Sequence, residues 1–539
     1  MGTYINPGNQ AFKRILDPNY VDMTGLISLM NRRIGGAQSL VCITRPRRFG
    51  KSYAAKMLSA YYDCSCDSHE LFDKKAIART KSYEEYLNQY NVVYLEITSF
   101  ISSARRQGIP LEEVPSMIVK ALHAELIQLN PELPSDKSLT ELFAECAEKK
   151  CGKPFVFIID EWDSMIREAK KNEEAQRRYL GLLREWFKSG IDTPKVIAAA
   201  YLTGILPIKK DGLQPAISDF QEYSMLYPGE FARFTGFSET QVKRLCKKNR
   251  IDFESVKAWY DGYEPGGEHS VYNPYSVMSA CREKDCRSFW TSTSAAEAMT
   301  DYINMDFDGL PETVAQLIGG AEIEVSTSQF QNDFERFKTK EDVLILLVHL
   351  GYLTYDAAHK TVRVPNEEVR NEFRNFLCND TVGENWRRLL DRSRRLLADT
   401  VRGDGEAVAE ALEEIRGEND APQFYNNEQS LRAIIKYAYI SAFGQYLTVE
   451  EIPTGKGIAD VAFLPTSLSR LPAMVVELKW NKTAGGAISQ IKKKNYPAKL
   501  KPYAGNILLV GINYDEKAGK LSCQIEKARA ECSSAPIPA

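Results

Sequence analysis

Histidines and long apolar runs are scarce in this sequence, and each shortage excludes a class of protein. Only 5 of the 539 residues are histidine, so histidine-based metal or hydrolytic chemistry is poorly supplied. The longest apolar stretches, 155–159 and 196–206, are far shorter than the roughly 20 residues of a membrane helix. The opening segment MGTYINPGNQAFKR lacks the apolar core of a secretory signal. We therefore expect a cytoplasmic protein without a membrane partner, whose catalysis would use carboxylates, lysines and Mg²⁺.

Cysteines at zinc-binding spacing are also missing. The 11 cysteines are scattered, and no CxxC pair occurs with a second pair or with histidines at the spacing of a zinc site. The nearest neighbours are Cys64 with Cys66 and Cys281 with Cys286. An odd number of dispersed cysteines predicts free, buried thiols.

Neither charge sign is in clear excess. Lys and Arg number 69 against 72 Asp and Glu, which gives a net charge of −3 and a pI near 6.1. A nucleic acid would have to be held by a local basic patch or by metal ions, because the chain as a whole does not attract it. The 44% hydrophobic and 26% charged residues are typical of globular proteins, and the length predicts roughly three or four domains.

The first half of the chain alternates apolar strands with helical stretches. The segments with continuous apolar and β-branched residues are Ser39–Ile43, Val92–Ile97, Phe155–Ile159 and Val196–Leu202. Strands of this kind, separated by helices, are typical of a parallel sheet with helices on both faces. We predict an α/β fold for this part of the chain.

The middle of the chain is more helical. A helix over 341–350, strands over 351–355 and 361–365, and a following helix resemble a winged-helix module. We favour a lid over a bound nucleotide as its role, with DNA binding as the alternative. Residues 385–417 are charged and helix-forming with a break at 403–405, which predicts a helical connector.

The C-terminal part combines strands and helices in a different order. The expected elements are a helix over 431–444, a strand and turn over 447–457, strands over 458–465 and 473–480, a helix over 486–496 and a strand over 506–514. The predicted regions are a sheet domain over 1–235, a helical and winged-helix-like region over 236–380, a connector over 381–425, a second α/β domain over 426–530 and a disordered tail over 531–539.

A strand, a loop and a helix in the first half carry the residues of a phosphate-binding loop. Such a loop needs N–H groups at a helix N-terminus, a lysine that reaches the phosphates and a hydroxyl for Mg²⁺. Gly50, Lys51 and Ser52 supply these in TRPRRFGKS, but Arg45 stands where the first glycine of GxxxxGK[ST] belongs. GKS alone is a weak signal, and the alternative is a strand-to-helix turn with one exposed lysine.

Acidic residues end the third apolar strand, in FIIDEWDS. Asp160 would hold Mg²⁺ through water, and Glu161 would orient or activate the attacking water. Ligands of α/β sheets lie at this carboxyl end of the strands. Capping of the next helix is the alternative, and it explains Asp163 better than the other two acids. Thr203 ends the following strand, where it would either sense the γ-phosphate or serve only the structure.

Two acids and a lysine on the C-terminal strands suit metal-dependent phosphodiester hydrolysis. Asp460 lies on one strand and Glu477 on the next, and Lys479 shares a face with Glu477 because side chains alternate along a strand. This chemistry needs carboxylates on the metal and a cation near the attacking water. An ExK pattern is common on sheet surfaces, but MVVELKW is otherwise apolar, and charges there are costly unless paired or metal-bound.

Several motifs resemble one family of proteins. TRPRRFGKS, YVDMTGLI, FIIDEWDSM, LTGILPI, WYDGY and VYNPYS, with GKGIAD and VVELKW near the end, are similar to bacterial AAA-ATPase-like proteins fused to a PD-(D/E)XK nuclease domain. The resemblance implies an N-terminal P-loop NTPase domain and a restriction-endonuclease-like C-terminal domain. Arg45 is then a family feature. Met23 departs from the lysine usual in its segment, and Ala459 departs from the proline of the superfamily's name.

The resemblance also implies a nucleotide site. The residues that would contact ATP are Arg45, Pro46, Arg47, Arg48, Phe49, Gly50, Lys51, Ser52, Asp160 and Thr203. Ser52 and Asp160 would hold Mg²⁺, and Glu161 would be catalytic. Arg47 and Arg48 would contact phosphate or, alternatively, pair with acids at the sheet edge. Arg233 would act in trans on a neighbouring nucleotide or, alternatively, only pair on the surface.

At the nuclease site, the resemblance implies Asp460 and Glu477 as ligands of Mg²⁺ or Mn²⁺. Lys479 would position or activate water, Gln490 would orient the site, and Glu428 would complete the acidic cluster. The lysines at 492–494 would contact phosphate or, alternatively, form a solvated helix face.

These observations predict a protein that binds ATP and hydrolyses it. Its nucleotide state would regulate a Mg²⁺-dependent nuclease domain that cleaves phosphodiester bonds; we favour DNA as the substrate, and the choice between DNA and RNA is left open. The alternative is an ATP-dependent switch or scaffold that binds nucleic acid or a protein without cutting. Self-association and the biological role are left open.

Overall fold

A computed structural model gives the fold. It describes residues 2–149, 153–170, 172–188, 193–208, 210–211, 214–215, 217, 219–234, 236–267, 270–290, 302–303, 307, 309–327, 337, 339–377, 384–417, 431–432, 435, 438–444, 446–454, 457–465, 471–493, 500 and 506–528. Among these residues, no helix has both the length and the apolar character that a membrane crossing requires.

The chain forms two compact units. The first comprises Met1–Ser292 and Glu324–Val369, and the second comprises Thr293–Ile323 and Arg370–Ala539. The chain therefore leaves the first unit, returns to it and leaves it again. The finer division into five regions stays a prediction.

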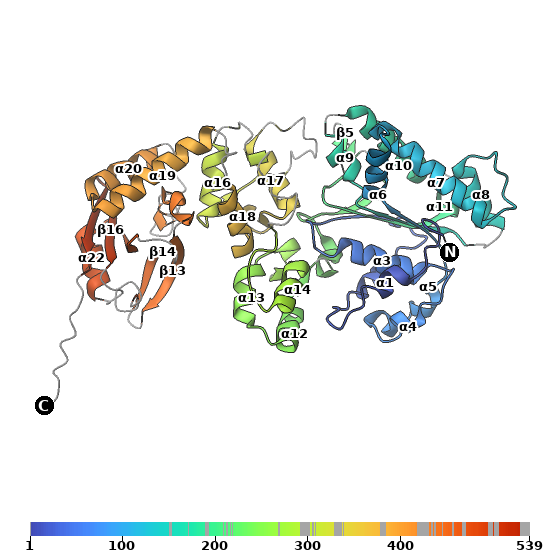
Figure 1. Ribbon diagram of the computed structural model, residues 1–539, viewed down its shortest axis with the longest axis horizontal. Coiled ribbons are helices and arrows are strands. Elements are labelled where there is room, and N and C mark those ends of the chain that lie inside the picture. Colours follow the sequence, from blue (N-terminus) through green and yellow to red (C-terminus); the bar gives the residue numbers. More distant parts are fainter. Residues whose placement is uncertain are drawn as a thin grey trace. The chain divides into compact units, whose positions relative to one another are not determined.

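A parallel sheet of five strands is the centre of the first unit (Figure 1). In spatial order its strands are β2 (Asn91–Glu96), β3 (Phe155–Asp160), β4 (Ile197–Gly204), β1 (Leu40–Thr44) and β7 (Gln221–Tyr223). The predicted strands are confirmed to within two residues at each end. The edge strand β7 was not predicted, because its three residues contain no apolar run.

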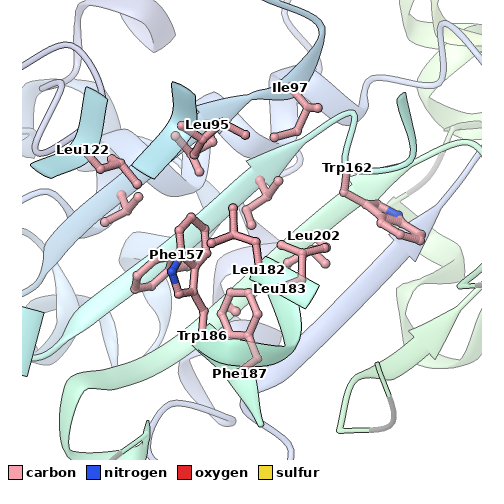
Figure 2. Packing of buried hydrophobic residues seen from close by; sticks show 14 of the residues in the cluster. Leu95, Ile97, Leu122, Phe157, Trp162, Leu182, Leu183, Trp186, Phe187 and Leu202 are labelled. Atoms are coloured by element: carbon pink, nitrogen blue, oxygen red, sulfur yellow. The ribbon is translucent and has the colours of Figure 1, made fainter. Parts of the chain in front are cut away.

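Helices cover both faces of this sheet, as predicted. One face carries α6 (Ile97–Gln107), α7 (Val114–Leu129), α8 (Leu139–Lys149) and α10 (Glu173–Phe187); the other carries α1 (Gln10–Lys13), α2 (Gly25–Asn31), α3 (Lys51–Tyr62), α4 (His69–Phe72) and α5 (Tyr83–Tyr86). Each face has its own hydrophobic core. Along β3, Phe157 belongs to the first core and its neighbours Val156 and Ile158 to the second, so both faces of the strand are buried. Figure 2 shows Phe157 next to Trp186 of α10, with ring centroids 5.8 Å apart.

The rest of the first unit consists of two smaller groups of elements. The first contains β8 (Phe237–Ser238), α12 (Glu239–Asn249), α13 (Phe253–Tyr260), β9 (Val271–Tyr272) and α14 (Pro274–Glu283). The second contains α17 (Lys340–Leu350), the antiparallel hairpin of β11 (Thr354–Asp356) and β12 (Thr361–Arg363), and the start of α18 (Glu367–Leu377). The predicted helix, hairpin and helix are therefore present, but the wing has a third strand, because β10 (Ile323–Glu324) pairs with β12.

The second unit contains a mixed sheet in the order β13 (Tyr446–Thr454), β14 (Gly457–Pro465), β15 (Ala473–Trp480), β16 (Ile507–Asp515) and β17 (Lys520–Lys527). Only β15 and β16 pair in parallel, and α22 (Ala484–Lys493) connects them. The edge strand β17 was not predicted. Its residues alternate between apolar and polar without a long apolar run.

Two long helices occupy the predicted connector. They are α19 (Glu384–Arg402) and α20 (Gly405–Gly417), with the break where it was expected. They pack within the second unit, because Glu413 of α20 accepts the N–H of Leu521 on β17 at 2.7 Å. Of the helix predicted over 431–444, residues 431, 432, 435 and 438 are helical, the segment ends in a 3₁₀ turn, Ile440–Gly444, and residues 433–434 and 436–437 lie outside the described residues. The predicted disordered tail also lies outside them.

The eight cysteines among the described residues are free thiols. Cys42, Cys146, Cys246 and Cys281 are buried, and the others are partly exposed. The prediction of free thiols is confirmed for this part of the chain.

Candidate functional site

The phosphate-binding loop connects β1 to α3. Gly50 is the N-cap residue of α3 and has φ +80°, in the left-handed region that glycine adopts without steric cost. Lys51 and Ser52 form the first turn of the helix. The loop thus leads directly into a helix N-terminus, where unpaired N–H groups and the helix dipole favour an anion.

The Lys51 ammonium lies over this loop. It donates hydrogen bonds to the carbonyls of Arg45 at 3.0 Å and Pro46 at 2.8 Å, and the side chain is buried. Burial lowers the pKa of Lys51, and the nearby carboxylates of Glu161, Asp163 and Asp160 oppose that change. A buried ammonium beside a helix N-terminus is suited to hold an anionic ligand.

Asp160 ends β3 beside the loop. It pairs across the sheet with Thr203 of β4 and Glu96 of β2, so the carboxyl ends of these strands meet at one edge. Burial raises the pKa of Asp160 to about 6, an interaction with the Ser52 hydroxyl opposes the rise, and the Glu161 carboxylate adds to it. The Tyr94 hydroxyl lies 3.4 Å from Oδ2, while the buried Oδ1 has no hydrogen-bond partner among the described residues. A buried carboxylate oxygen without a partner, beside a serine hydroxyl, fits the oxygen ligands that Mg²⁺ prefers.

Glu161 is held by an arginine that the sequence did not indicate. Arg167 of α9 (Ser164–Glu168) donates from Nη2 to Glu161 Oε2 at 2.6 Å and from Nε to Asp163 Oδ2 at 2.9 Å. The same Asp163 oxygen accepts the N–H groups of Ile205 and Leu206 after β4. Arg167 and Asp163 thus connect Glu161 to the end of the neighbouring strand.

The capping interpretation of Asp163 was wrong. Asp163 stands at the N-cap position of α9, but its side chain makes no capping hydrogen bond. It is fully buried and bonds to Arg167 and to the chain after β4 instead. A buried carboxylate takes the strongest donors within reach, and here these come from outside the first turn of α9.

The remaining loop residues pack against the protein. The Arg45 guanidinium donates to the carbonyls of Thr44 at 2.7 Å and Tyr223 at 2.8 Å, which ties β1 to β7, and burial lowers its pKa to about 9. Pro46 lies close to Gly351, and Phe49 meets Tyr263 edge to face at 5.1 Å between ring centroids. The structure therefore places Arg45, Pro46 and Phe49 in supporting positions around the loop.

Arg48 lines the cavity beside the loop, and its predicted contact with phosphate stays a prediction. Its guanidinium lies 4.1 Å from the ring centroid of Tyr275 on α14, and it donates to the carbonyl of Phe289. Arg47 is partly buried, and its pKa is lowered mainly by this burial and next by the nearby Arg167. Arg48 thus fastens the phosphate loop to the helical group that contains α14.

A cavity of about 500 Å³ opens beside Gly50, Lys51 and Ser52. Its other walls are mainly apolar and come from three segments distant in sequence: Ile15, Asp17, Asn19, Tyr20, Val21, Met23 and Leu26; Phe234, Gly236 and Phe237; and Pro274, Tyr275, Met278 and Arg282. Glu161 also borders it, as do Arg48, Phe49, Tyr53, Ala54 and Met57 of the loop and α3, whereas Asp160 and Thr203 are buried and do not line it. Polar groups at one end and apolar side chains at the other match a nucleotide, with phosphates at the first and a base at the second.

Sequence reasoning missed most of these apolar walls. Met23 was noticed only as a departure from the family pattern, yet it lines the cavity. Its neighbours Tyr20 and Val21 belong to the same YVDMTGLI motif. This motif was the feature of the sequence that could have indicated the cavity wall. Arg233 lies exposed on the 3₁₀ turn Gly229–Phe234 and does not line this cavity.

The nuclease-like residues lie on β14, β15 and α22 of the second unit. The antiparallel register pairs Val461 with Val476, so the next positions, Asp460 and Glu477, stand across from each other. Opposite residues of an antiparallel pair share a face of the sheet. Lys479 follows Glu477 by two positions on that face.

Hydrogen bonds join these residues into one cluster. Lys479 Nζ lies 2.9 Å from Glu477 Oε1, and the Gln490 amide donates to the same oxygen. Asp460 Oδ2 accepts the N–H of Leu478 at 2.8 Å. Glu477, Lys479 and Asp460 are all buried, at 1%, 7% and 9% exposure. The four described residues that were predicted for this site therefore meet at one place.

Arg432 is a member of this cluster that the sequence analysis missed. Its Nη2 donates to Asp460 Oδ1 at 2.6 Å. Glu428, the predicted third acid, lies outside the described residues. Among the residues that are described, no group of three or more His, Cys, Asp or Glu side chains could hold a metal ion, so this site offers two carboxylates. Two facing carboxylates fit a divalent cation that takes its remaining ligands from water or phosphate.

Of the lysines after Gln490, Lys492 pairs with Glu526 on β17, and Lys494 lies outside the described residues. The ion pair favours the interpretation of this helix face as a solvated surface.

Comparison with family models identifies two parts of the chain. Residues 7–214 match a family described as predicted AAA-ATPase, and residues 426–523 match the PD-(D/E)XK nuclease superfamily. The two matches contain the phosphate loop and the acidic cluster, respectively. The predicted resemblance of the N-terminal part to AAA-ATPase-like proteins and of the C-terminal part to PD-(D/E)XK nucleases is therefore confirmed.

Solved structures with similarity to the chain include the ORC2 protein of Aeropyrum pernix in its ADPNP-ADP complexes, at 12% identity and a TM-score of 0.31 over 68% of this chain and 97% of that one. A Walker-type ATPase of Pyrococcus abyssi is 12% identical, with a TM-score of 0.30 over 65% of this chain and 94% of that one. No curated protein matches the chain.

Proposed function

We propose that this chain, which carries an AAA-ATPase-like domain at residues 7–214 and a PD-(D/E)XK nuclease-superfamily domain at residues 426–523, is an ATP-regulated nuclease. It binds and hydrolyses ATP in the first unit and hydrolyses phosphodiester bonds, in DNA, in the second. Both reactions use Mg²⁺, and Mn²⁺ also serves the nuclease site. The state of the nucleotide regulates the cutting.

In the ATPase site, the phosphates lie over the N-terminus of α3, and the base lies against the apolar wall. Ser52 and Asp160 would hold Mg²⁺, which supplies charge neutralisation on the phosphates. Lys51 moves its ammonium from the loop carbonyls to the phosphates. Glu161, which borders the cavity, orients the attacking water, and Arg167 fixes the position of its carboxylate.

In the nuclease site, Asp460 and Glu477 would hold the divalent cation, which polarises the phosphate and lowers the pKa of a bound water. Lys479 lies beside Glu477 and stabilises the negative charge that develops on the phosphate. Gln490 holds Glu477 in place through its amide.

The observation that carries the nuclease proposal is the burial of this charged cluster inside the apolar strand β15. Glu477 and Lys479 are each less than a tenth exposed, between Val475, Val476 and Leu478. Two charges in such a strand reduce stability relative to apolar residues of the same size. A cluster in which Lys479 and Gln490 bond to Glu477, and Asp460 bonds to the backbone of Leu478, is therefore best explained by a chemical role.

The nuclease proposal is tested with plasmid and single-stranded DNA in the presence of Mg²⁺ or Mn²⁺. Glu477→Ala and Lys479→Ala should each lower cleavage at least about 100-fold, because each removes a group that acts on the reacting phosphate. Glu516→Ala and Lys517→Ala, in the exposed turn after β16, are the matched controls and should cut at the wild-type rate. Equal cleavage by all five proteins would rule out this site. DNA binding by a wild type that does not cut would favour the switch or scaffold.

ATP turnover tests the first unit separately. Lys51→Ala should abolish nucleotide binding, and Glu161→Gln should bind ATP but turn it over at least about 100-fold more slowly. Lys56→Ala, on the same helix, is the control. Wild-type turnover by both site variants would show that the assignment is wrong.

A further inference from the structure

Arg432 contacts a carboxylate oxygen that the proposed nuclease chemistry needs for a metal ion. Its Nη2 lies 2.6 Å from Asp460 Oδ1, while Oδ2 of the same carboxylate accepts the N–H of Leu478. Both oxygens of Asp460 are thus engaged by the protein. The Asp460 side chain is 13% exposed and that of Arg432 is 21% exposed, so the pair is largely shielded from water.

Among the described residues, the charges of the cluster balance. Asp460 and Glu477 contribute two negative charges, and Arg432 and Lys479, each within hydrogen-bond distance of one of them, contribute two positive charges. A divalent cation bound by the two carboxylates would meet two cations next to its ligand oxygens. Repulsion between like charges at such separations is substantial where water is largely excluded.

The two cations differ in their freedom to move. Lys479 lies on the same strand as its partner, two residues away, and is 9% exposed as a side chain. Arg432 comes from a different segment, 28 residues before Asp460, and its side chain is more exposed. A guanidinium also binds phosphate through two parallel hydrogen bonds, which an ammonium does not.

We propose that Arg432 is a counter-cation that neutralises Asp460 until a phosphodiester enters the site, and that its guanidinium then transfers to the phosphate. This inference rests on the proposed function. It makes metal binding and phosphodiester binding mutually dependent, because the phosphate removes the cation that competes with the metal. By linkage, each ligand raises the affinity for the other by the same factor. The nuclease site would then hold its metal tightly only with its substrate.

The test is to titrate Mn²⁺ into the nucleotide-free full chain and to measure Mn²⁺ binding both by calorimetry and by the Mn²⁺ electron paramagnetic resonance signal. The titration is done with and without a short DNA duplex of phosphorothioate linkages. In the wild type, the duplex should tighten Mn²⁺ binding at least about tenfold. In Arg432→Gln, binding without DNA should be at least about tenfold tighter than in the wild type, and the duplex should change it by less than about twofold.

Two control variants separate charge from structure. Arg432→Lys keeps the positive charge and should retain weak Mn²⁺ binding without DNA. Arg394→Gln removes an arginine from an exposed pair with Asp391 at 2.9 Å, and should behave as the wild type.

The outcomes distinguish this inference from the nuclease proposal. If Arg432→Gln binds Mn²⁺ without DNA no more tightly than the wild type, the inference is wrong even if Asp460 and Glu477 bind the metal. If Asp460→Asn and Glu477→Gln leave all Mn²⁺ binding unchanged, the metal site itself is wrong. Thermal unfolding of each variant shows whether the fold is intact. If Arg432→Gln does not fold, the wild type still decides, because Mn²⁺ binding that the duplex does not tighten would overturn the inference.

Discussion

Arg167 illustrates how single residues hold the charged parts of the ATPase site. It is paired with both Glu161 and Asp163, and its side chain is only 13% exposed. Arg105 pairs with Glu168 of the same helix, α9, at 2.7 Å, but this pair is 56% and 38% exposed. The two arginines therefore make similar contacts in different dielectric surroundings, and their contributions to stability should differ.

Arg167→Ala should lower the free energy of unfolding by about 3 kcal/mol, since it leaves Asp163 buried without its cation. Arg105→Ala should lower it by less than about 1 kcal/mol, because exposed ion pairs contribute little. Urea denaturation of the two variants measures both values. Equal losses would mean that the Arg167 network does not stabilise the fold in the way its geometry indicates.

Asp160 should make both stability and Mg²⁺–nucleotide binding depend on pH. Its pKa rises with burial from the ordinary 3.8 to about 6, so the folded state binds this proton more tightly than the unfolded state does. The contribution of Asp160 to the free energy of unfolding is therefore highest below pH 3.8 and falls as the pH rises to 6. The free energy of unfolding decreases by about 3 kcal/mol in total over this range, and it stays lower at neutral pH.

In the absence of nucleotide, Asp160→Asn should therefore be more stable than the wild type at pH 7 and closer to it at pH 4. The ability of Mg²⁺ to tighten nucleotide binding should disappear in the wild type as the pH falls below about 6, because a protonated carboxyl is a poor ligand. A fluorescent ATP analogue titrated with and without Mg²⁺ between pH 5 and 8 measures this. An Mg²⁺ effect that does not change with pH would contradict it.

At the scale of elements, the connection between α13 and β9 depends on particular glycines. Gly262, between α13 and β9, has φ +106°, and a Cβ there would lie 1.9 Å from the carbonyl oxygen of Pro365. Gly267, five residues later, has φ +80° but nothing within 4 Å of the same position. Both positions have the positive φ that disfavours other residues, and only Gly262 is also closely packed.

Gly267→Ala should lower the free energy of unfolding by about 1 kcal/mol, from backbone strain alone. Gly262→Ala should lower it by at least about 3 kcal/mol, because the backbone of Pro365 has to move as well. The difference in thermal stability between the two variants measures the part of the destabilisation that comes from the steric clash with Pro365. Similar costs would show that the contact with Pro365 relaxes easily.

At the scale of the whole molecule, the proposed ATPase and nuclease sites lie in different compact units. The chain passes between these units more than once, since residues 293–323 of the second are inserted between two parts of the first. The regulation of one site by the other, which is part of the proposed function, would act through these connections of the chain.

ATP should change the rate of DNA cleavage by at least about fivefold, the lower end of usual coupling between sites. Lys51→Ala should cut DNA at the nucleotide-free rate and show no response to ATP. Glu477→Ala should keep its ATP turnover within about twofold of the wild type, because it does not touch the first site. Identical cleavage with and without ATP in the wild type would contradict the regulation and leave each separate activity intact.

The sequence alone determined the elements whose signal is local. The apolar strands of both sheets, the loop from Arg45 to Ser52, and the acids at the end of β3 are encoded by short continuous runs of residues. A strand buried on both faces has to be apolar throughout, so it can be predicted from its own residues without knowledge of the neighbouring strands. The edge strands β7 and β17 lack that burial and were not predicted.

The tertiary structure decided which residues meet. The ion pair of Arg432 with Asp460, 28 residues apart, and the apolar wall around Met23 join segments that carry no mark of each other in the sequence. Such contacts are selected by the packing of whole elements and by the need of each buried charge for a partner. Local periodicity extends over a turn or a strand, whereas the partner of a buried charge depends on how distant elements pack.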